Sequence, residues 1–295
     1  MTATATTKAG FSDYLELTKP RLSLLSVLTA LVGYLAARPP GDALKLLFVV
    51  VGTSLAAGGV AALNQWLEYD TDAQMKRTAT RPIPTGKVAT GSAFILGVLM
   101  CIASLFLLFA KVNSLAALFT LLTIFSYLGW YTPAKRSSRW STEIGALAGA
   151  FPPLIGWSAG EGQVTALGWI LFAVLLFWQI PHFMAVAWLY RKDYSAVHFP
   201  MLPVRDETGS RVAAWSLINT VVLVIVSVLP TILGLTTYYY LVVAIAGGVW
   251  FLWRAIAFTR PQNRDIAARK LFLTSIGYLP LVLCALVADR MIFDA

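Results

Sequence analysis

Long apolar segments alternate with short polar stretches along almost the whole chain. A helix needs about 20 largely apolar residues to cross the hydrocarbon core of a bilayer. Nine segments approach or exceed that length, the first and fifth being the shortest: 22–38, 44–66, 91–110, 113–132, 143–159, 164–189, 212–234, 238–258 and 271–290. The pattern predicts an all-α, polytopic membrane protein with about nine transmembrane helices. No linker divides the chain, so residues 1–295 are expected to form one domain, with residues 1–20 as a polar N-terminal segment.

Composition and charge agree with a membrane protein. Of the residues 58% are hydrophobic and 13% charged, whereas soluble domains carry about 25% charged residues. The net charge of +9 does not indicate nucleic-acid binding, because the basic residues lie in short loops. The N-terminal segment and the loops after the even-numbered segments hold 19 of the 23 lysines and arginines. By the positive-inside rule this asymmetry predicts a cytoplasmic N-terminus and a periplasmic C-terminus.

The N-terminal segment favours a bacterial inner-membrane protein. The N-terminal segment lacks the apolar region and cleavage site of a signal peptide, and it contains Asp13 and Glu16, which argue against a mitochondrial transit peptide. Cys101 and Cys284 both lie inside apolar segments and are expected to be reduced, structural thiols. No cluster of cysteines and histidines suggests zinc or iron–sulfur.

Three oxygen-bearing side chains recur every fourth residue at the end of the second apolar segment. They are Asn64, Glu68 and Asp72, which we call the polar stripe. Four residues advance a helix by about 400°, so these side chains share one face. Carboxylates beside a membrane span are costly and indicate a functional site. Oxygen ligands suit a hard cation, and Mg²⁺ in particular binds through a few carboxylates plus substrate phosphates.

Basic residues in two loops predict a phosphate site on the same side of the membrane. Arg77 and Arg81 follow the stripe, and Lys135 and Arg136 follow the fourth segment. Guanidinium groups bind phosphate oxygens in a bidentate manner. The alternative is that these cations only set the topology or extend to the membrane interface.

The sixth segment adds two further candidates. His182 follows Pro181 inside the segment, where a histidine usually faces a cavity or the bundle interior. Lys192 and Asp193 lie at the cytoplasmic end of the segment, on the side of the polar stripe. Asp193 is therefore predicted to complete the metal site, and Lys192 to contact the diphosphate.

Together these residues predict a metal–diphosphate clamp before an apolar bundle. Such a clamp stabilises charge that develops on a leaving group. A diphosphate joined to a hydrocarbon tail is an isoprenyl diphosphate. The predicted chemistry is ionisation to an allylic cation and its capture by an electron-rich acceptor.

Several motifs resemble the intramembrane prenyltransferases of the UbiA superfamily, and among them the haem O synthases. The superfamily motif NxxxDxxxD appears as Asn64–Asp72, with Glu68 in place of the first aspartate. The other motifs are MKRTATRP (75–82), YTPAKR (131–136), GALAGAFPPLIGW (145–157), WQIPHF (178–183) and RKDYSAVHFPMLPV (191–204). The resemblance is dense from residue 13 to about 210. It departs from the superfamily pattern at Val197, where a second aspartate would follow Asp193, and at Glu143 in TEIG.

This resemblance implies nine transmembrane helices around a central cavity, with Mg²⁺, farnesyl diphosphate and protohaem IX as ligands. It implies transfer of the farnesyl group to a vinyl group of protohaem IX, with hydration, giving haem O and diphosphate. Asn64, Glu68 and Asp72 would bind the metal–diphosphate, and His182 would face the haem. Arg77, Arg81, Lys135 and Arg136 would contact the phosphates. A haem A synthase is a candidate partner that receives the product.

Two other functions are compatible with parts of the pattern. An aromatic prenyltransferase that makes a quinone precursor would share the clamp but not the PHF…DY…PMLPV segment. An ion-coupled transporter would use the acids as an ion site. Transporters place such sites near the bilayer midplane, often between repeated halves, whereas these acids gather near one face and no repeat is evident.

Overall fold

Each predicted apolar segment is helical in the structure, a computed structural model that describes residues 9–39 and 41–293. Residues 1–8, which belong to the predicted N-terminal segment and include Lys8, and the last two residues lie outside the described part. Within the described part there is no β-strand. The helices are α1 (Phe11–Leu17), α2 (Pro20–Ala36), α3 (Ala43–Leu67), α4 (Tyr69–Asp72), α5 (Thr90–Lys111), α6 (Ser114–Phe125), the π-helical η1 (Ser126–Tyr131), α7 (Thr132–Ser137), α8 (Ser141–Ala150), α9 (Pro152–Glu161), α10 (Ala166–Leu189), α11 (Arg191–Ala196), α12 (Leu202–Arg205), α13 (Ser210–Ile232), α14 (Tyr238–Thr259) and α15 (Arg264–Ile292).

The helices account for the predicted membrane spans. Seven stretches of the described chain are long and apolar enough to cross a bilayer: α3, α5, the continuous run Ser114–Ser137, α10, α13, α14 and α15. The short apolar helix α2 is the first predicted span. The fifth is divided into α8 and α9, because Pro152 and Pro153 supply no backbone N–H and therefore start a new helix. The all-α, multi-pass fold is confirmed, with about nine crossings.

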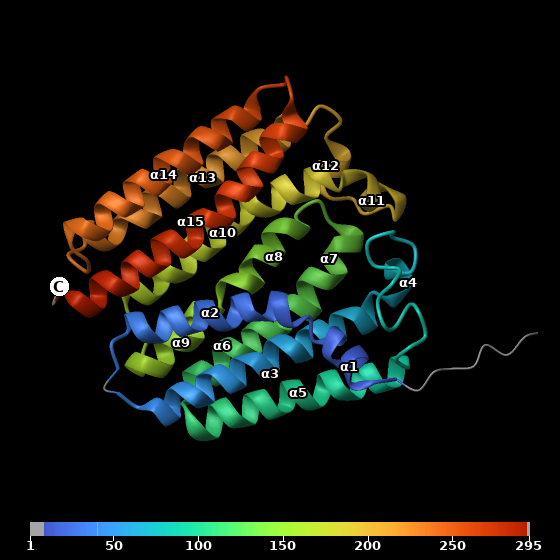
Figure 1. The fold of residues 1–295 in the computed structure, drawn as a ribbon, viewed down its shortest axis with the longest axis horizontal. Helices are drawn as coiled ribbons and strands as arrows, with labels where there is room; N and C mark the ends of the chain where they lie inside the picture. Colours follow the sequence, from blue (N-terminus) through green and yellow to red (C-terminus); the bar gives the residue numbers. More distant parts are fainter. Residues whose placement is uncertain (1–8, 40, 294–295) are drawn as a thin grey trace, which may run out of the picture.

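The helices form two groups that meet along α2 and α8 (Figure 1). One core cluster joins α10, α13, α14 and α15, and a second joins α2, α3, α5, α6 and α9. Helices α2 and α9 pack with their backbones in contact: a Cβ added to Gly156 would lie 1.7 Å from the carbonyl oxygen of Ala30. Small residues that allow such close approach are typical of helix packing in membranes.

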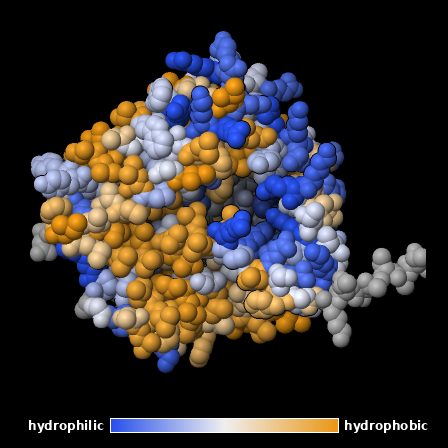
Figure 2. Space-filling view, in the orientation of Figure 1, coloured by the Kyte–Doolittle hydropathy of each residue, from blue (hydrophilic) through white to orange (hydrophobic). Residues whose placement is uncertain are grey.

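The surface separates an apolar body from a polar end. Many large apolar side chains are exposed, among them Phe106, Phe109, Val242 and Trp253, as expected for surfaces that face lipid. Polar residues gather toward the end that carries α4, α7, α11 and α12, and a hollow opens between the apolar and polar regions of this face (Figure 2). The C-terminal end of α15 lies at the opposite end of the bundle (Figure 1).

Candidate active site

The polar stripe lies at the join between α3 and α4, and it is buried. Helix α3 ends at Leu67, Glu68 is its C-cap, and the chain resumes helical structure at Tyr69. The exposed fractions of Asn64, Glu68 and Asp72 are 2%, 5% and 1%. Asn64 Nδ2 donates a hydrogen bond to Glu68 Oε2 at 2.9 Å. Because these polar groups are removed from water, they do not form an ordinary solvated helix end.

Each member of the stripe contacts a cation from a different part of the chain. Lys135 Nζ, on α7, donates to both oxygens of Glu68 at 2.9 and 3.1 Å. The guanidinium of Arg81, in the loop after α4, contacts Asp72 Oδ2 at 2.5 Å. Lys19 Nζ, immediately before α2, donates to Asn64 Oδ1 at 3.2 Å. The site therefore has acids at its centre and cations from three segments around them.

These charges shift the protonation of the groups that lie outside the spans. Burial alone would raise the pKa of Glu68, but Lys135 and Lys19 together with the Asn64 hydrogen bond hold it below its ordinary value. Burial, and then the positive charges of Arg81 and Lys135, lower the pKa of Lys19 to about 7. Glu68 is therefore ionised at neutral pH, whereas Lys19 holds its proton weakly and would hold it more strongly beside an added anion.

The donor set fits a hard divalent cation that brings further ligands with it. Asp72 Oδ1 is buried and has no hydrogen-bond partner, although Oδ2 of the same carboxylate is paired. Within the described residues no group of three or more acidic, histidine or cysteine side chains is close enough to hold a metal. A cation here would thus depend on Asp72 Oδ1 and its neighbours in the stripe and on oxygens of a substrate, which is how Mg²⁺ is usually bound.

The structure brings only some of the other predicted residues to the stripe. Arg136 contacts Asp70 at 2.6 Å and the carbonyl oxygen of Leu67 at 3.0 Å, so it supports the turn after α3. Arg77 lies over the ring of Tyr190, with its guanidinium carbon 5.7 Å from the ring centroid. This contact joins the loop that follows α4 to the residue that precedes α11.

Asp193 and Lys192 lie on α11, at the same end of the bundle as α4 and α7 (Figure 1). Asp193 is half-buried and Lys192 is exposed. Over residues 9–39 and 41–293 neither side chain has a hydrogen-bond or ion-pair partner, so no such bond joins Asp193 to the stripe. Its part in a metal site stays a prediction.

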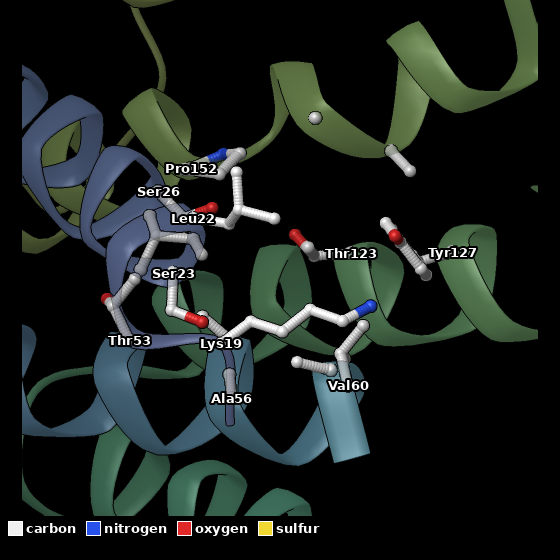
Figure 3. A pocket seen from close by; sticks show the side chains of 15 residues that line it. Lys19, Leu22, Ser23, Ser26, Thr53, Ala56, Val60, Thr123, Tyr127 and Pro152 are labelled. Atoms are coloured by element: carbon white, nitrogen blue, oxygen red, sulfur yellow. The ribbon is translucent and has the colours of Figure 1, made fainter. Parts of the chain in front are cut away.

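An apolar cavity of about 150 Å³ begins beside Lys19. Helices α2, α3, α6, η1, α8 and α9 line it, mostly with small or apolar side chains such as Ala56, Val60 and Pro152. In Figure 3 the side chain of Lys19 extends along the cavity toward Tyr127 and Val60. The π-helical turn η1 contributes Tyr127, and such turns are frequent at functional sites. An apolar cavity therefore begins directly at the charged site.

Lys19 is the site residue that the sequence did not reveal. By sequence it is one of several basic residues in the N-terminal segment, whose charges are explained by membrane topology alone. It reaches the stripe because its backbone adopts a left-handed conformation at the start of α2, with φ of 45°. The one sequence signal is the Lys-Pro pair directly before the first apolar segment.

Comparison with known proteins agrees with this geometry. The model of the UbiA prenyltransferase family matches residues 26–276. A relative from Opitutus terrae named "Protoheme IX farnesyltransferase" is 77% identical over 99% of both chains. One from Solibacter usitatus with the same name is 41% identical over 94% of this chain and 98% of its own.

Solved structures share the fold at low sequence identity. A digeranylgeranylglyceryl phosphate synthase superposes with a TM-score of 0.82 at 19% identity, covering 96% of this chain and 99% of its own. A UbiA homologue from Archaeoglobus fulgidus, bound to DMAPP and Mg²⁺, gives 0.67 at 14% identity, covering 95% and 100%. From the family match and the near-complete coverage of its relatives, this chain belongs to the UbiA prenyltransferase family.

Proposed function

We propose that the protein transfers the farnesyl group of farnesyl diphosphate to a vinyl group of protohaem IX, giving haem O and diphosphate. The observation that carries this proposal is a buried polar stripe surrounded by three cations at the mouth of an apolar cavity. The names of relatives with 77% and 41% identity support farnesyl diphosphate and protohaem IX as substrates.

In this proposal the stripe and its cations bind the diphosphate. Mg²⁺ held by Asn64, Glu68 and Asp72 would neutralise negative charge on the leaving group. Arg81 and Lys135 pair with Asp72 and Glu68, and Lys19 hydrogen-bonds Asn64. All three are placed to turn toward phosphate oxygens when the substrate binds. Arg77, Arg136 and Lys192 line the same end and would add phosphate contacts. Asp193, at the same end of the bundle, would add a further metal ligand.

The farnesyl chain would lie in the apolar cavity, with its first carbon beside Lys19. The bond between this carbon and the diphosphate oxygen breaks, and the oxygen keeps the electron pair. The terminal carbon of the haem vinyl group then forms a bond to the allylic cation. Water adds to the remaining carbocation next to the porphyrin and loses a proton, so the product gains one farnesyl group and one water.

The charge distribution supports an orientation of the protein in its membrane. The 19 basic residues on one side support a bacterial inner-membrane protein with a cytoplasmic N-terminus and a periplasmic C-terminus. The lipid bilayer is its environment, and a haem A synthase is a candidate recipient of haem O.

The test is a product analysis with a choice of acceptors. Membranes that contain the protein are incubated with farnesyl diphosphate, Mg²⁺ and either haem or 4-hydroxybenzoate. The proposal predicts a haem that is heavier by one farnesyl group and one water, and no prenylated benzoate. Prenylation of the benzoate alone would support the quinone-precursor alternative. Ion uptake without release of diphosphate would support the transporter.

A further inference from the structure

His182 lies in the second half of α10, within a cluster of aromatic rings. Its ring stacks on Trp178, with a centroid distance of 4.8 Å and an interplanar angle of 26°. The rings of Phe272, on α15, and Phe183 lie 5.1 and 5.3 Å away. The imidazole is half-buried. These contacts hold it in one orientation at the junction of two helices.

A hydrogen-bond chain fixes which ring nitrogen carries the proton. His182 Nδ1 lies 2.7 Å from Ser275 Oγ, and this hydroxyl donates to the carbonyl oxygen of Phe272 at 2.6 Å. A hydroxyl has only one proton to donate. Since that proton goes to the carbonyl, Oγ accepts from His182, which must carry its proton on Nδ1. The lone pair of the neutral ring is therefore on Nε2.

The second nitrogen, Nε2, is free to bind a ligand. It has no hydrogen-bond partner in the part of the chain that the structure describes. It is also absent from the fully buried polar atoms without a partner, so it is accessible from outside the protein atoms that pack around the ring. Trp178 Nε1 donates to the carbonyl oxygen of Ser275 at 2.7 Å, which fixes the register between α10 and α15. A histidine that donates one N–H to a fixed acceptor and presents the other nitrogen has the arrangement found at metal sites.

The surroundings limit which metal such a histidine could bind. Within residues 9–39 and 41–293 no three histidine, cysteine or acidic side chains form a metal-binding group, so a bare ion would lack ligands. A metalloporphyrin brings four nitrogens of its own and needs only one axial ligand from the protein. The aromatic rings around His182 also suit a flat, apolar macrocycle.

We propose that His182 Nε2 is an axial ligand to the iron of the bound haem, and that Ser275 is a positioning residue that fixes the tautomer and ring orientation. This inference rests on the proposed function in taking haem as the acceptor. It names Nε2 as the ligand atom, predicts a bond from this atom to iron, and gives α15 a role through Ser275. Iron ligation would fix the height and tilt of the porphyrin.

The test compares iron-containing and metal-free porphyrin. Purified protein in detergent is titrated with haemin and with protoporphyrin IX, and binding is followed by the Soret band. His182→Ala is expected to weaken haemin binding by about tenfold or more and to remove the spectrum of a nitrogen-ligated iron. Protoporphyrin IX should bind the variant as it binds the wild type. Ser275→Ala is expected to cost about tenfold for haemin alone, in line with partners of other metal ligands, and Ser275→Thr to recover most of it.

Added imidazole provides a control for folding. In His182→Gly, millimolar imidazole should restore the nitrogen-ligated spectrum. Equal losses for haemin and protoporphyrin IX, or an unchanged haemin spectrum in both histidine variants, would overturn the ligand assignment while wild-type haem O formation leaves the proposed function intact. If wild-type protein bound haemin and made no haem O, the proposed function would fail and the ligation result would still be read from the spectra.

Discussion

Glu68 and Lys135 form a buried ion pair, with Nζ 2.9 Å from Oε1, that joins the end of α3 to α7. The two side chains are 67 positions apart in sequence. Their side chains are only 6% and 15% exposed, so each charge depends on the other for compensation. The stability of the bundle therefore depends on this pairing, and a bound diphosphate would change it by offering Lys135 a second negative partner.

Removing one member of this pair should destabilise the protein more than removing both charges. Lys135→Met leaves the Glu68 carboxylate buried without its cation, a change that typically costs about 3–5 kcal/mol. In Lys135→Met with Glu68→Gln the buried charge is gone, and much of the loss should be recovered. Thermal unfolding in detergent measures both. Equal destabilisation by the single and double variants would show that the two charges are not coupled.

Asp72→Asn should abolish most turnover while leaving the protein in the membrane. The substitution keeps the shape but removes the charge of a side chain that is 1% exposed and has one free oxygen. Losing one such electrostatic contact to a leaving group costs about 10²–10³ in rate. Initial rates with farnesyl diphosphate and saturating Mg²⁺ provide the measurement.

The matched control for Asp72 is Asp70, two residues away in α4. Its side chain is 48% exposed and pairs with Arg136 rather than with the stripe. Asp70→Asn is expected to stay within about threefold of the wild-type rate, since an exposed pair contributes little. Similar rates for the two variants would contradict the functional difference between the buried and exposed acids.

Lys19 gives the ligand-free protein a defined pH dependence. Its pKa falls from 10.5 to about 7 on folding. Between these values the unfolded chain binds the proton and the folded chain does not, so stability rises with pH across this window. The unfolding temperature of the wild type should therefore increase more between pH 7 and 9 than that of Lys19→Met. An identical pH response of the two proteins would exclude a Lys19 that loses its proton on folding.

Filling the apolar cavity should shorten the prenyl chain that the protein accepts. Ala56 is buried on α3 and lines the cavity. Ala56→Leu is expected to lower kcat/KM for farnesyl diphosphate about tenfold, since two displaced methylene groups are worth roughly 1.6 kcal/mol, with less effect on geranyl diphosphate. Val51→Leu, at an exposed position of the same helix, is the control. Parallel losses for both chain lengths would place the tail elsewhere.

The sequence predicted what a single helix determines. The length of the apolar segments predicted the spans, and the four-residue spacing of Asn64 and Glu68 predicted neighbouring side chains, which their hydrogen bond shows. Asp72 lies on the separate helix α4, because the helix is interrupted at Glu68. The proline pair at Pro152 and Pro153 is visible in the sequence. The sequence does not show whether it divides the span into two helices or only kinks one helix, because both have the same composition.

Contacts between helices were beyond the sequence. Nothing in the spacing shows that Lys19 meets Asn64, or that Ser275 accepts a hydrogen bond from His182, because these pairs depend on how distant helices pack. The predicted meeting of Asp193 with the stripe also depends on packing, and it stays a prediction.

The central claim is that the buried oxygens and a diphosphate bind one divalent cation together. Electron paramagnetic resonance of Mn²⁺, used in place of Mg²⁺, tests it directly with farnesyl thiodiphosphate, an analogue that resists ionisation. The account predicts that wild-type protein depletes the free Mn²⁺ signal strongly only when the analogue is present, and that Asp72→Asn does not. Equal depletion by the two proteins, or tight binding of the analogue without any divalent cation, would contradict it.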